Sequence, residues 1–334
     1  MSECPASEPP LVIGLVNNMP DGALKATEEQ FGDLLHEAAG PAGIHLRKFF
    51  LPSVPRRESG RHHLSQSYSP LSELMDCRLD GLIVTGAVPS GARFEHEPFW
   101  PCFTQLADWA NENKVPTFWS CLAAHAAVKH FHGIERYRMS RKLSGVFSCE
   151  KAAAHPLLAG APSRWQAPHS RYNDLREADL AAVGYRILSR LEPGSPDMFV
   201  NPGQNLSVFS QGHLEYDETT LFYEYRRDLG QYLRGHTAIP PSPPAGYFEP
   251  GTVEAIEGLN GLEPGGAPAE YLGVVEDILS HAVITANWQP MAHRVFANWI
   301  RLLRQERSCQ RAVNAATAAR PGQGLSGELE WRVE

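Results

Sequence analysis

The sequence lacks several features that would assign it to a specialised class. It has no run approaching the roughly 20 apolar residues that a membrane span needs. Its first ten residues lack the basic start and apolar centre of a secretory signal. It also lacks a basic surplus: its net charge is −8, whereas nucleic-acid binders need a basic face to neutralise phosphates. We therefore expect a cytoplasmic protein that binds neither membranes nor nucleic acid.

The cysteines lack the spacing of a metal or disulfide framework. There are 6 of them, scattered along the chain without any C-x-x-C pair, so we predict neither a metal site nor a disulfide scaffold. In a reducing compartment each one is either a small buried apolar side chain or a reactive thiol. They are Cys4, Cys77, Cys102, Cys121, Cys149 and Cys309.

Short apolar runs alternate with amphipathic segments along much of the 334-residue chain. This alternation predicts an α/β fold with a doubly wound, mostly parallel sheet flanked by helices. The expected strands are 11–16, 44–51, 81–84, 115–119, 185–191 and 206–209. The expected helices are 27–39, 98–113, 122–131, 219–233 and 294–303. In the first helix, Thr27 and Gln30 have the spacing of a capping box.

Other segments have the composition of irregular structure. Residues 52–70 are rich in Pro, Ser, Arg and His, and residues 239–268 are dense in Pro and Gly. We expect the first to be a loop and the second a long surface excursion. Residues 306–334 turn polar and Ala/Gly-rich, which predicts a flexible tail. The sequence thus indicates a single domain over residues 11–305.

Cys121 is the candidate nucleophile. It lies in Phe-Trp-Ser-Cys-Leu-Ala-Ala, where an expected strand joins an expected helix. A helix N-terminus stabilises a thiolate, and the N–H of Leu122 is free to stabilise an oxyanion. The placement is that of a nucleophile elbow with Cys in place of Ser. Taken alone, the segment fits a buried core thiol better than a nucleophile, and Ser120 is a rival nucleophile.

The segment Ser-Gln-Gly-His-Leu-Glu-Tyr supplies a candidate base. His213 and Glu215 follow the strand expected at 206–209. In extended backbone, residues two apart point to the same side, although a turn after Gly212 would alter this. Glu215 would orient the imidazole while the other ring nitrogen faces the thiol.

Several ordered segments resemble the homoserine O-succinyltransferase/O-acetyltransferase family, which has the class I glutamine amidotransferase-like fold. The resemblance covers roughly residues 11–305. The matching segments are Asn17-Asn18-Met19-Pro20, Thr27-Glu28-Glu29-Gln30-Phe31, Asp80-Gly81-Leu82-Ile83-Val84-Thr85-Gly86-Ala87, Lys142-Leu143-Ser144-Gly145-Val146, Ala167-Pro168-His169-Ser170-Arg171-Tyr172, Gly212-His213-Leu214-Glu215-Tyr216-Asp217 and Asn298-Trp299-Ile300.

This resemblance implies a Cys-His-Glu triad formed by Cys121, His213 and Glu215. It implies substrate binding by Lys142 and Ser170. Glu224 and Arg227 match a pair that holds the amino-acid acceptor. They lie three apart on an expected helix and share a face. Without the resemblance, this pair would fit a surface ion pair and Lys142 a solvated side chain.

The chain departs from the family pattern around the expected donor site. Ser90 stands where the family has Gly or Glu, and Arg93 replaces a usual Glu. Leu122 stands where Trp often follows the nucleophile, and His125 where Gln is usual. Because Ser90 is small and Arg93 can bind a carboxylate, we favour succinyl-CoA over acetyl-CoA as donor. The bland alternative is that Arg93 points to solvent.

The predicted reaction is ping-pong transfer of an acyl group from acyl-CoA to L-homoserine through an acyl-cysteine. Backbone N–H groups of Leu122 and of the Ser90 loop would hold the oxyanion. No bound cofactor is expected, and the resemblance implies methionine biosynthesis and a homodimer. The alternatives are a glutamine amidotransferase or peptidase-like hydrolase of the same fold, transfer to another hydroxy amino acid such as serine, and a non-enzymatic binding protein.

Overall fold

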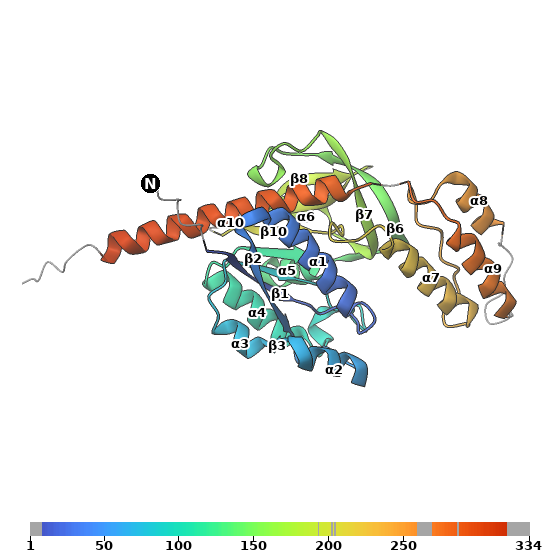
Figure 1. Cartoon of the computed structure of the whole chain (residues 1–334), viewed down its shortest axis with the longest axis horizontal. Coiled ribbons are helices and arrows are strands. Elements are labelled where there is room, and N and C mark those ends of the chain that lie inside the picture. The colour runs from blue at the N-terminus through green and yellow to red at the C-terminus, as the bar shows by residue number, and fades with distance from the viewer. Residues whose placement is uncertain are drawn as a thin grey trace, which may run out of the picture.

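Within the described residues, all ten strands belong to one mixed sheet, in the order β3-β2-β1-β4-β5-β10-β9-β8-β6-β7 (Figure 1). The computed structural model of the chain describes residues 9–192, 194–201, 203, 205–258, 269–285 and 287–318. Within this part of the chain, no helix combines the length and apolarity needed to cross a bilayer. The predicted α/β class is confirmed.

The first half of the sheet is parallel, as predicted. Its strands are short, and most of their residues are buried because helices cover both faces. They are β1 (Leu11–Val16), β2 (Ile44–Phe50), β3 (Ser69–Pro70), β4 (Gly81–Val84), β5 (Thr117–Ser120) and β10 (Ser207–Ser210). Strands β1, β4, β5 and β10 are parallel neighbours, so their carboxyl ends meet at one edge.

The second half of the sheet is antiparallel, and sequence patterns predicted only one of its strands. It consists of β6 (Tyr137–Lys151), β7 (Arg164–Asp174), β8 (Arg186–Leu191) and β9 (Ser195–Val200). Only β8 was expected. The long hairpin strands β6 and β7 carry polar and charged residues through most of their length, so they lack the apolar run that reveals a buried strand.

Helices cover both faces of the parallel half. On one face lie α1 (Leu24–Ala39) and α10 (Gln289–Ala318), and on the other α4 (Trp100–Glu112) and α5 (Leu122–His132). The first face is closed by aromatic packing, with the rings of Phe118 and Phe296 5.1 Å apart. Two further helices are short: α3 (Leu71–Met75), which follows β3, and α6 (Glu177–Ala182), which follows β7.

A helical group lies at one end of the molecule beside β6 and β7 (Figure 1). It contains α7 (Thr220–Leu233), α8 (Pro250–Glu257) and α9 (Ala269–Ser280). It has its own apolar cluster, which includes the fully buried Tyr247 and Trp288. The expected surface excursion 239–268 is therefore wrong in part, because it contains α8 and Tyr247. Residues 259–268 lie outside the described residues.

Two local predictions near the N-terminus are wrong. The expected loop 52–70 contains α2 (Glu58–Ser67), whose buried Leu64 packs with Leu24 and Tyr68. The capping box does not form, because α1 begins at Leu24, three residues before Thr27. Gln30 instead donates hydrogen bonds to Asp217 Oδ2 (3.1 Å) and Thr220 Oγ1 (2.7 Å) near the start of α7.

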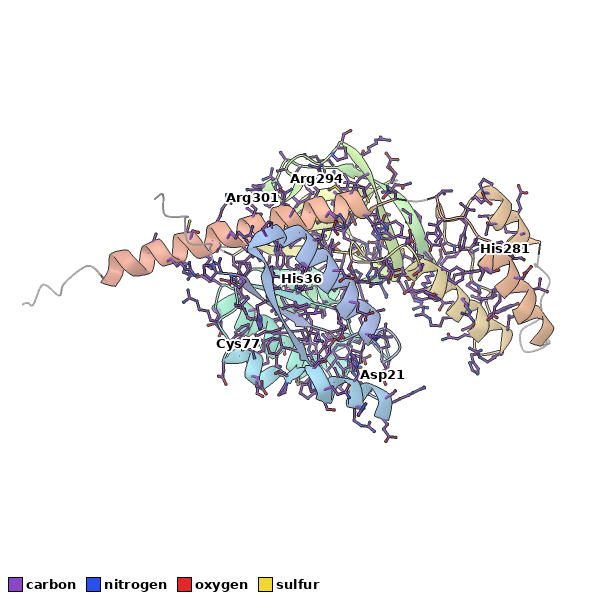
Figure 2. All side chains as sticks on the ribbon, in the orientation of Figure 1. Asp21, His36, Cys77, His281, Arg294 and Arg301 are labelled. Atoms are coloured by element: carbon purple, nitrogen blue, oxygen red, sulfur yellow. The ribbon has the colours of Figure 1, made fainter. Side chains whose placement is uncertain are left out.

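Helix α10 extends the last predicted helix at both ends. It continues to Ala318, so residues 306–318 of the expected tail are helical; residues 319–334 lie outside the described part. Arg294 and Arg301 project from it (Figure 2), and Arg301 donates to Pro156 O (3.2 Å). Arg307, beyond the predicted domain boundary, is 9% exposed and donates to the carbonyls of Pro9 and Pro10.

Candidate functional site

The site lies where the parallel strands β4, β5 and β10 end. β4 continues into Thr85-Gly86, β5 into Cys121, and β10 into Gln211-Gly212-His213. Asn18, after β1, ties this edge together: its N–H donates to Thr85 Oγ1 (2.8 Å) and its amide to Thr85 O (3.0 Å). Ligands of open α/β sheets bind at such carboxyl ends.

Cys121 occupies a strained turn between β5 and α5. Its φ is 50° and its ψ −114°, a left-handed region that costs a non-glycine residue about 1–3 kcal/mol. Among the described residues other than glycine, only Lys114 shares a positive φ. The Cys121 N–H donates to Ser210 O (2.7 Å), which joins the elbow to the end of β10. The sequence prediction of a strand-to-helix elbow is confirmed in its geometry.

Gly86 allows the loop after β4 to press against this elbow. A Cβ on Gly86 would lie 2.4 Å from Leu122 Cβ and 3.0 Å from Leu122 N, so a larger residue would push the loop away. As the first residue of α5, Leu122 has an N–H that the helix itself leaves without an acceptor. That N–H is placed directly after the thiol, where an oxyanion donor is needed.

His213 is held by Glu215 and by Tyr216. Its Nδ1 lies 2.8 Å from Glu215 Oε1, and the Tyr216 ring stacks on the imidazole with centroids 4.3 Å apart. The three residues form a tight turn rather than the extended backbone that we expected, yet the His–Glu pair still meets. Ser120 does not compete as a nucleophile in this arrangement, because its hydroxyl points to Glu215 Oε1 (3.5 Å).

The electrostatics of the triad favour an ion pair. Burial opposes a charged imidazole, but the negative charges of the Cys121 thiolate and Glu215 outweigh it and raise the pKa of His213 well above its usual value. The surroundings therefore stabilise the protonated, imidazolium form of His213. In this form His213 is an acid that can protonate a leaving group.

A second polar cluster faces the triad from β6, β7 and α7. Glu224 accepts hydrogen bonds from Ser170 Oγ and from Tyr216 Oη (3.1 Å). Lys142 Nζ lies 3.5 Å from Glu224 Oε2 and 2.7 Å from Asp228 Oδ2. The structure thus brings the sequence-predicted Lys142, Ser170 and Glu224 together. Tyr216 connects this cluster to the triad, because it stacks on the imidazole and donates to Glu224.

Arg227 borders the same cluster through Asp228. Its Nε donates to Asp228 Oδ1 (2.9 Å), while about half of its side chain, 52%, remains exposed. A cavity of about 340 Å³ opens on its other side, between α7 and α9, with Arg226 and Arg234 also in its lining. Arg227 can therefore reach a ligand without leaving its partner, since a guanidinium has five N–H donors.

The loop that contains Ser90 and Arg93, which we predicted to bind the acyl group of the donor, packs against Glu97. The Gly91 N–H (2.7 Å) and the Ser90 hydroxyl (3.0 Å) donate to the buried carboxylate of Glu97. Oxyanion stabilisation by a backbone N–H of the Ser90 loop stays our prediction. Arg93 is exposed, with Glu95 as its electrostatic neighbour, which favours the alternative that its side chain points to solvent.

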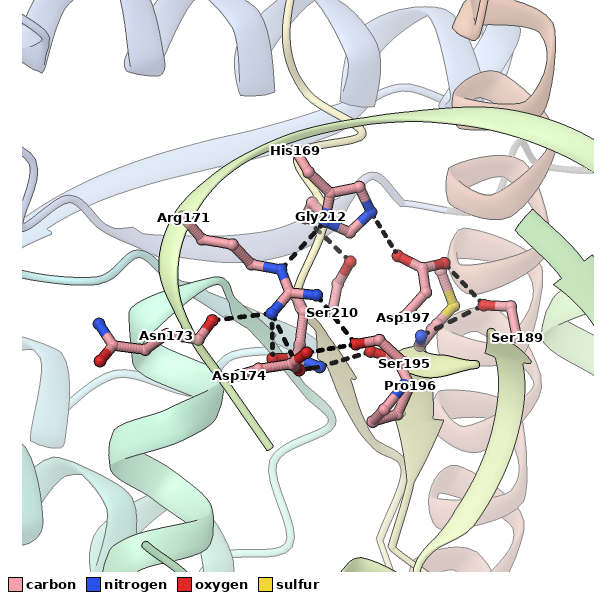
Figure 3. Close-up of polar contacts among 12 residues, drawn as sticks. His169, Arg171, Asn173, Asp174, Ser189, Ser195, Pro196, Asp197, Ser210 and Gly212 are labelled. Atoms are coloured by element: carbon pink, nitrogen blue, oxygen red, sulfur yellow. Dashed lines mark hydrogen bonds and ion pairs between the residues drawn. The ribbon is translucent and has the colours of Figure 1, made fainter. Parts of the chain in front are cut away.

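A buried polar network lies behind the base (Figure 3). Arg171, 3% exposed, pairs with Asp174 (2.9 Å) and donates to His169 Nδ1 (3.3 Å), whose Nε2 lies 3.3 Å from Asp197 Oδ1. These groups surround the Gln211-Gly212 backbone, and Gln211 N donates to Asp197 O (2.8 Å). The network fixes the segment that carries His213.

One cluster within the described residues has the donor atoms of a metal site: Cys149, His169 and Asp197. All three are buried, and their donor atoms lie within 4.8 Å of one another. Burial, reinforced by Asp197, raises the pKa of the Cys149 thiol far above its usual value. A protonated thiol is a poor ligand, because metals bind the thiolate. The absence of a metal site stays our prediction.

Sequence reasoning missed the contacts of Tyr216 and Asp228 with the predicted site residues, and the contact of Arg136 with the donor loop. Tyr216 directly follows Glu215, and Asp228 directly follows Arg227, so adjacency to a predicted site residue was the available signal. Arg136 precedes β6, far along the chain from the donor loop, and its guanidinium reaches back to the carbonyls of Gly91 and Ala92. No pattern in the sequence indicates that contact.

Comparison with known proteins places the chain in a defined group. A family model described as homoserine O-succinyltransferase matches residues 6–309. A homoserine O-succinyltransferase from Methylorubrum extorquens is 43% identical over 297 residues, which is 88% of this chain and 87% of that protein. One from Bradyrhizobium japonicum is 46% identical over 254 residues, 76% and 77% of the two chains.

A solved structure of a glutamine amidotransferase from Thermotoga maritima aligns with a TM-score of 0.49 at 13% identity, covering 88% of this chain and 97% of that one.

Proposed function

The chain belongs to the homoserine O-succinyltransferase family, and we propose that it transfers a succinyl group from succinyl-CoA to the side-chain hydroxyl of L-homoserine. The observation that supports this most directly is the strained Cys121 elbow next to a buried His213–Glu215 pair. Succinyl-CoA is consumed as a substrate, and no bound cofactor takes part in the proposal. The product is an activated homoserine for methionine biosynthesis.

In the first half-reaction, the Cys121 thiolate attacks the thioester carbonyl of the donor. The carbonyl oxygen becomes an oxyanion, which the Leu122 N–H stabilises. As the tetrahedral intermediate collapses, the bond to the coenzyme A sulfur breaks, and the His213 imidazolium protonates that sulfur. The enzyme is left with a succinyl-cysteine and a neutral imidazole.

In the second half-reaction, the homoserine hydroxyl attacks the succinyl-cysteine. Neutral His213 takes the hydroxyl proton, the new ester bond forms, and Cys121 leaves as a thiolate beside the regenerated imidazolium. Glu215 holds Nδ1 throughout (2.8 Å), so the other ring nitrogen keeps its direction toward the reacting atoms.

The cluster on β6, β7 and α7 is the proposed acceptor site. Arg227 binds the α-carboxylate of homoserine and Glu224 its α-ammonium, because these are the charge pairings that both side chains favour. Lys142 and Ser170 hold Glu224 in place (Lys142 Nζ at 3.5 Å). Because Tyr216 donates to Glu224 and stacks on the His213 imidazole, a shift of Glu224 would also move His213.

Mass spectrometry of the intact protein tests the proposal. Mixed with succinyl-CoA but no homoserine, the parent protein should gain one succinyl group, and adding homoserine should remove it. Cys121→Ala should show no gain, whereas Cys102→Ala, a change outside the site, should behave like the parent. Succinylation that persists in Cys121→Ala would rule out this nucleophile.

The remaining alternatives have separate readouts. A glutamine amidotransferase or peptidase-like hydrolase would release glutamate from glutamine, and we expect no such activity. Replacing homoserine by serine tests the acceptor, and we expect slow turnover. We also propose that the protein is cytoplasmic and forms a homodimer, the oligomeric state that the family resemblance suggests. Its proposed substrates are acyl-CoA and L-homoserine.

A further inference from the structure

Succinyl-CoA differs from acetyl-CoA by a free carboxylate, so a succinyl-selective enzyme needs a cationic group near the nucleophile. The inference below rests on the proposed function and names that group. Arg93 does not qualify, because its side chain is exposed on the surface. Arg136, which immediately precedes β6, does.

The guanidinium of Arg136 is fixed against the donor loop. Its Nη2 donates to Gly91 O (3.3 Å) and Ala92 O (3.2 Å). Its Cζ lies 4.0 Å from the centroid of the Phe94 ring, a cation–π distance, and Phe94 itself is buried. Two carbonyls and one aromatic face thus hold the charged group in a single orientation before any ligand arrives.

One nitrogen of this fixed group has nothing to donate to. Arg136 Nη1 is buried and has no hydrogen-bond partner among the described residues. A buried unpaired donor is costly, most of all on a charged group. Glu97, whose negative charge acts on Arg136, accepts its hydrogen bonds from the Ser90 hydroxyl and the Gly91 N–H. The unused donor is therefore available to an anion from outside the chain.

The position of Arg136 suits the donor side of the site. The loop that it anchors begins at Gly86, which packs on Leu122, the residue after the nucleophile. Burial lowers the pKa of Arg136, and the negative charges of Glu97, Glu135 and Cys121 act in the opposite direction. The contact of Gly86 with Leu122 connects the loop that Arg136 anchors to the residue after the nucleophile. An extended succinyl chain carries its carboxylate roughly 4 Å beyond the thioester carbon.

We propose that Arg136 binds the free carboxylate of the succinyl group through Nη1, in the donor and in the succinyl-cysteine, and so selects succinyl-CoA over acetyl-CoA. Acetyl-CoA has no group for this nitrogen and leaves it unpaired, which disfavours the smaller donor. Glu97 supports the arrangement from the other side of the loop, because it holds Ser90 and Gly91 and so places the carbonyls that anchor Arg136.

The test compares Arg136→Gln with Arg93→Gln, a matched change of an exposed arginine in the same region. For each protein, the rate of acyl-enzyme formation is measured by intact mass with succinyl-CoA and, separately, with acetyl-CoA. Arg136→Gln should lower kcat/KM for succinyl-CoA by about 10- to 100-fold, the worth of a charge-assisted hydrogen bond. It should leave acetyl-CoA near the parent rate, and Arg93→Gln should change neither.

If Arg136 only anchored the loop, Arg136→Gln would slow acylation by both donors equally. An unchanged ratio of the acylation rates with succinyl-CoA and acetyl-CoA therefore overturns the proposal. Arg136→Lys keeps the positive charge and should recover part of the succinyl preference, which guards against a loss caused by poor folding. A parent protein that forms no succinyl-cysteine at all would refute the proposed function itself, before Arg136 is considered.

Discussion

At the scale of single residues, His125 illustrates how burial sets charge. It is 1% exposed, and its Nε2 lies 2.7 Å from Gln211 Oε1, within the network behind the base. Burial, helped by the nearby positive charge of Arg171, lowers the pKa of His125 to about 3. The folded protein therefore keeps this imidazole neutral over the whole physiological range.

His125 should make the protein sensitive to acid. Below about pH 6.5 the unfolded chain protonates this histidine and the folded protein does not, so the free energy of unfolding falls as the pH drops. Between pH 7 and pH 5 the loss from one such group is roughly 2 kcal/mol. His125→Gln, which cannot titrate, should reduce the loss by about that amount in urea unfolding at the two pH values.

The exposed His96 provides the control, because His96→Gln should leave the pH dependence of unfolding as it is in the parent. An identical slope in His125→Gln and the parent would mean that His125 titrates normally in the folded protein.

At the scale of elements, the turn after β10 depends on the absence of a side chain at Gly212. A Cβ there would lie 2.9 Å from both His169 Nε2 and Asp197 Oδ1. Neither neighbour can yield easily, because each is buried and held in the network of Figure 3. The turn and the network therefore determine the position of His213 together.

Gly212→Ala should force this turn to move. We expect a loss of about 1–3 kcal/mol in the free energy of unfolding, as overpacked cores show, and a lower kcat because His213 is displaced. Gly251→Ala, where nothing lies within 4 Å of an added Cβ, should cost no stability. Parent-like kcat in a folded Gly212→Ala protein would show that the turn tolerates the methyl group.

A substitution on helix α7 should affect the second half-reaction and leave the first unchanged. Arg227→Ala is expected to lower kcat/KM for homoserine by an amount equivalent to about 2–3 kcal/mol, the worth of a charge-assisted bidentate contact. Formation of the succinyl-cysteine should stay near the parent rate. Arg226→Ala, one residue earlier in an exposed ion pair with Glu276, should affect neither step. Equal losses in both half-reactions would move Arg227 to the donor side or to the fold.

At the scale of the whole molecule, α10 connects the two ends of the described chain. Its Trp299 and Phe296 pack against the sheet, and Arg307 donates to Pro9 O (2.8 Å) and contacts Asp80 Oδ2 (3.3 Å). Asp80 Oδ2 in turn accepts from Val12 N (2.8 Å) at the start of β1. Residues assigned to a tail by composition thus stabilise the first strand of the sheet.

Truncation can test this role of the C-terminal helix. A chain ending at residue 305 loses Arg307 and should be less stable to urea by about 1–3 kcal/mol, because buried partners are left unpaired. A chain ending at residue 312 keeps Arg307 and should unfold like the parent. If residues 306–318 were only a flexible extension, the chain ending at residue 305 would also unfold like the parent. Equal stability of the two truncated chains would contradict the structural role of Arg307.

The sequence by itself determined the features that depend on neighbouring residues. Most of the parallel strands, the elbow at Cys121 and the pairing of His213 with Glu215 were visible, because each needs only a short apolar run, a strand-to-helix junction or a two-residue spacing. The family resemblance then identified Lys142, Ser170 and Glu224, which the fold does bring together.

Only the tertiary structure decided the features that depend on distant segments. The polar hairpin of β6 and β7 has no apolar run of its own and is recognisable only once it pairs into the sheet. Arg93 lies in the donor loop by sequence, yet it faces solvent, while Arg136 reaches the loop from the start of β6. Which arginine anchors the donor loop depends on how the sheet orders its strands, and local patterns carry no information about that order.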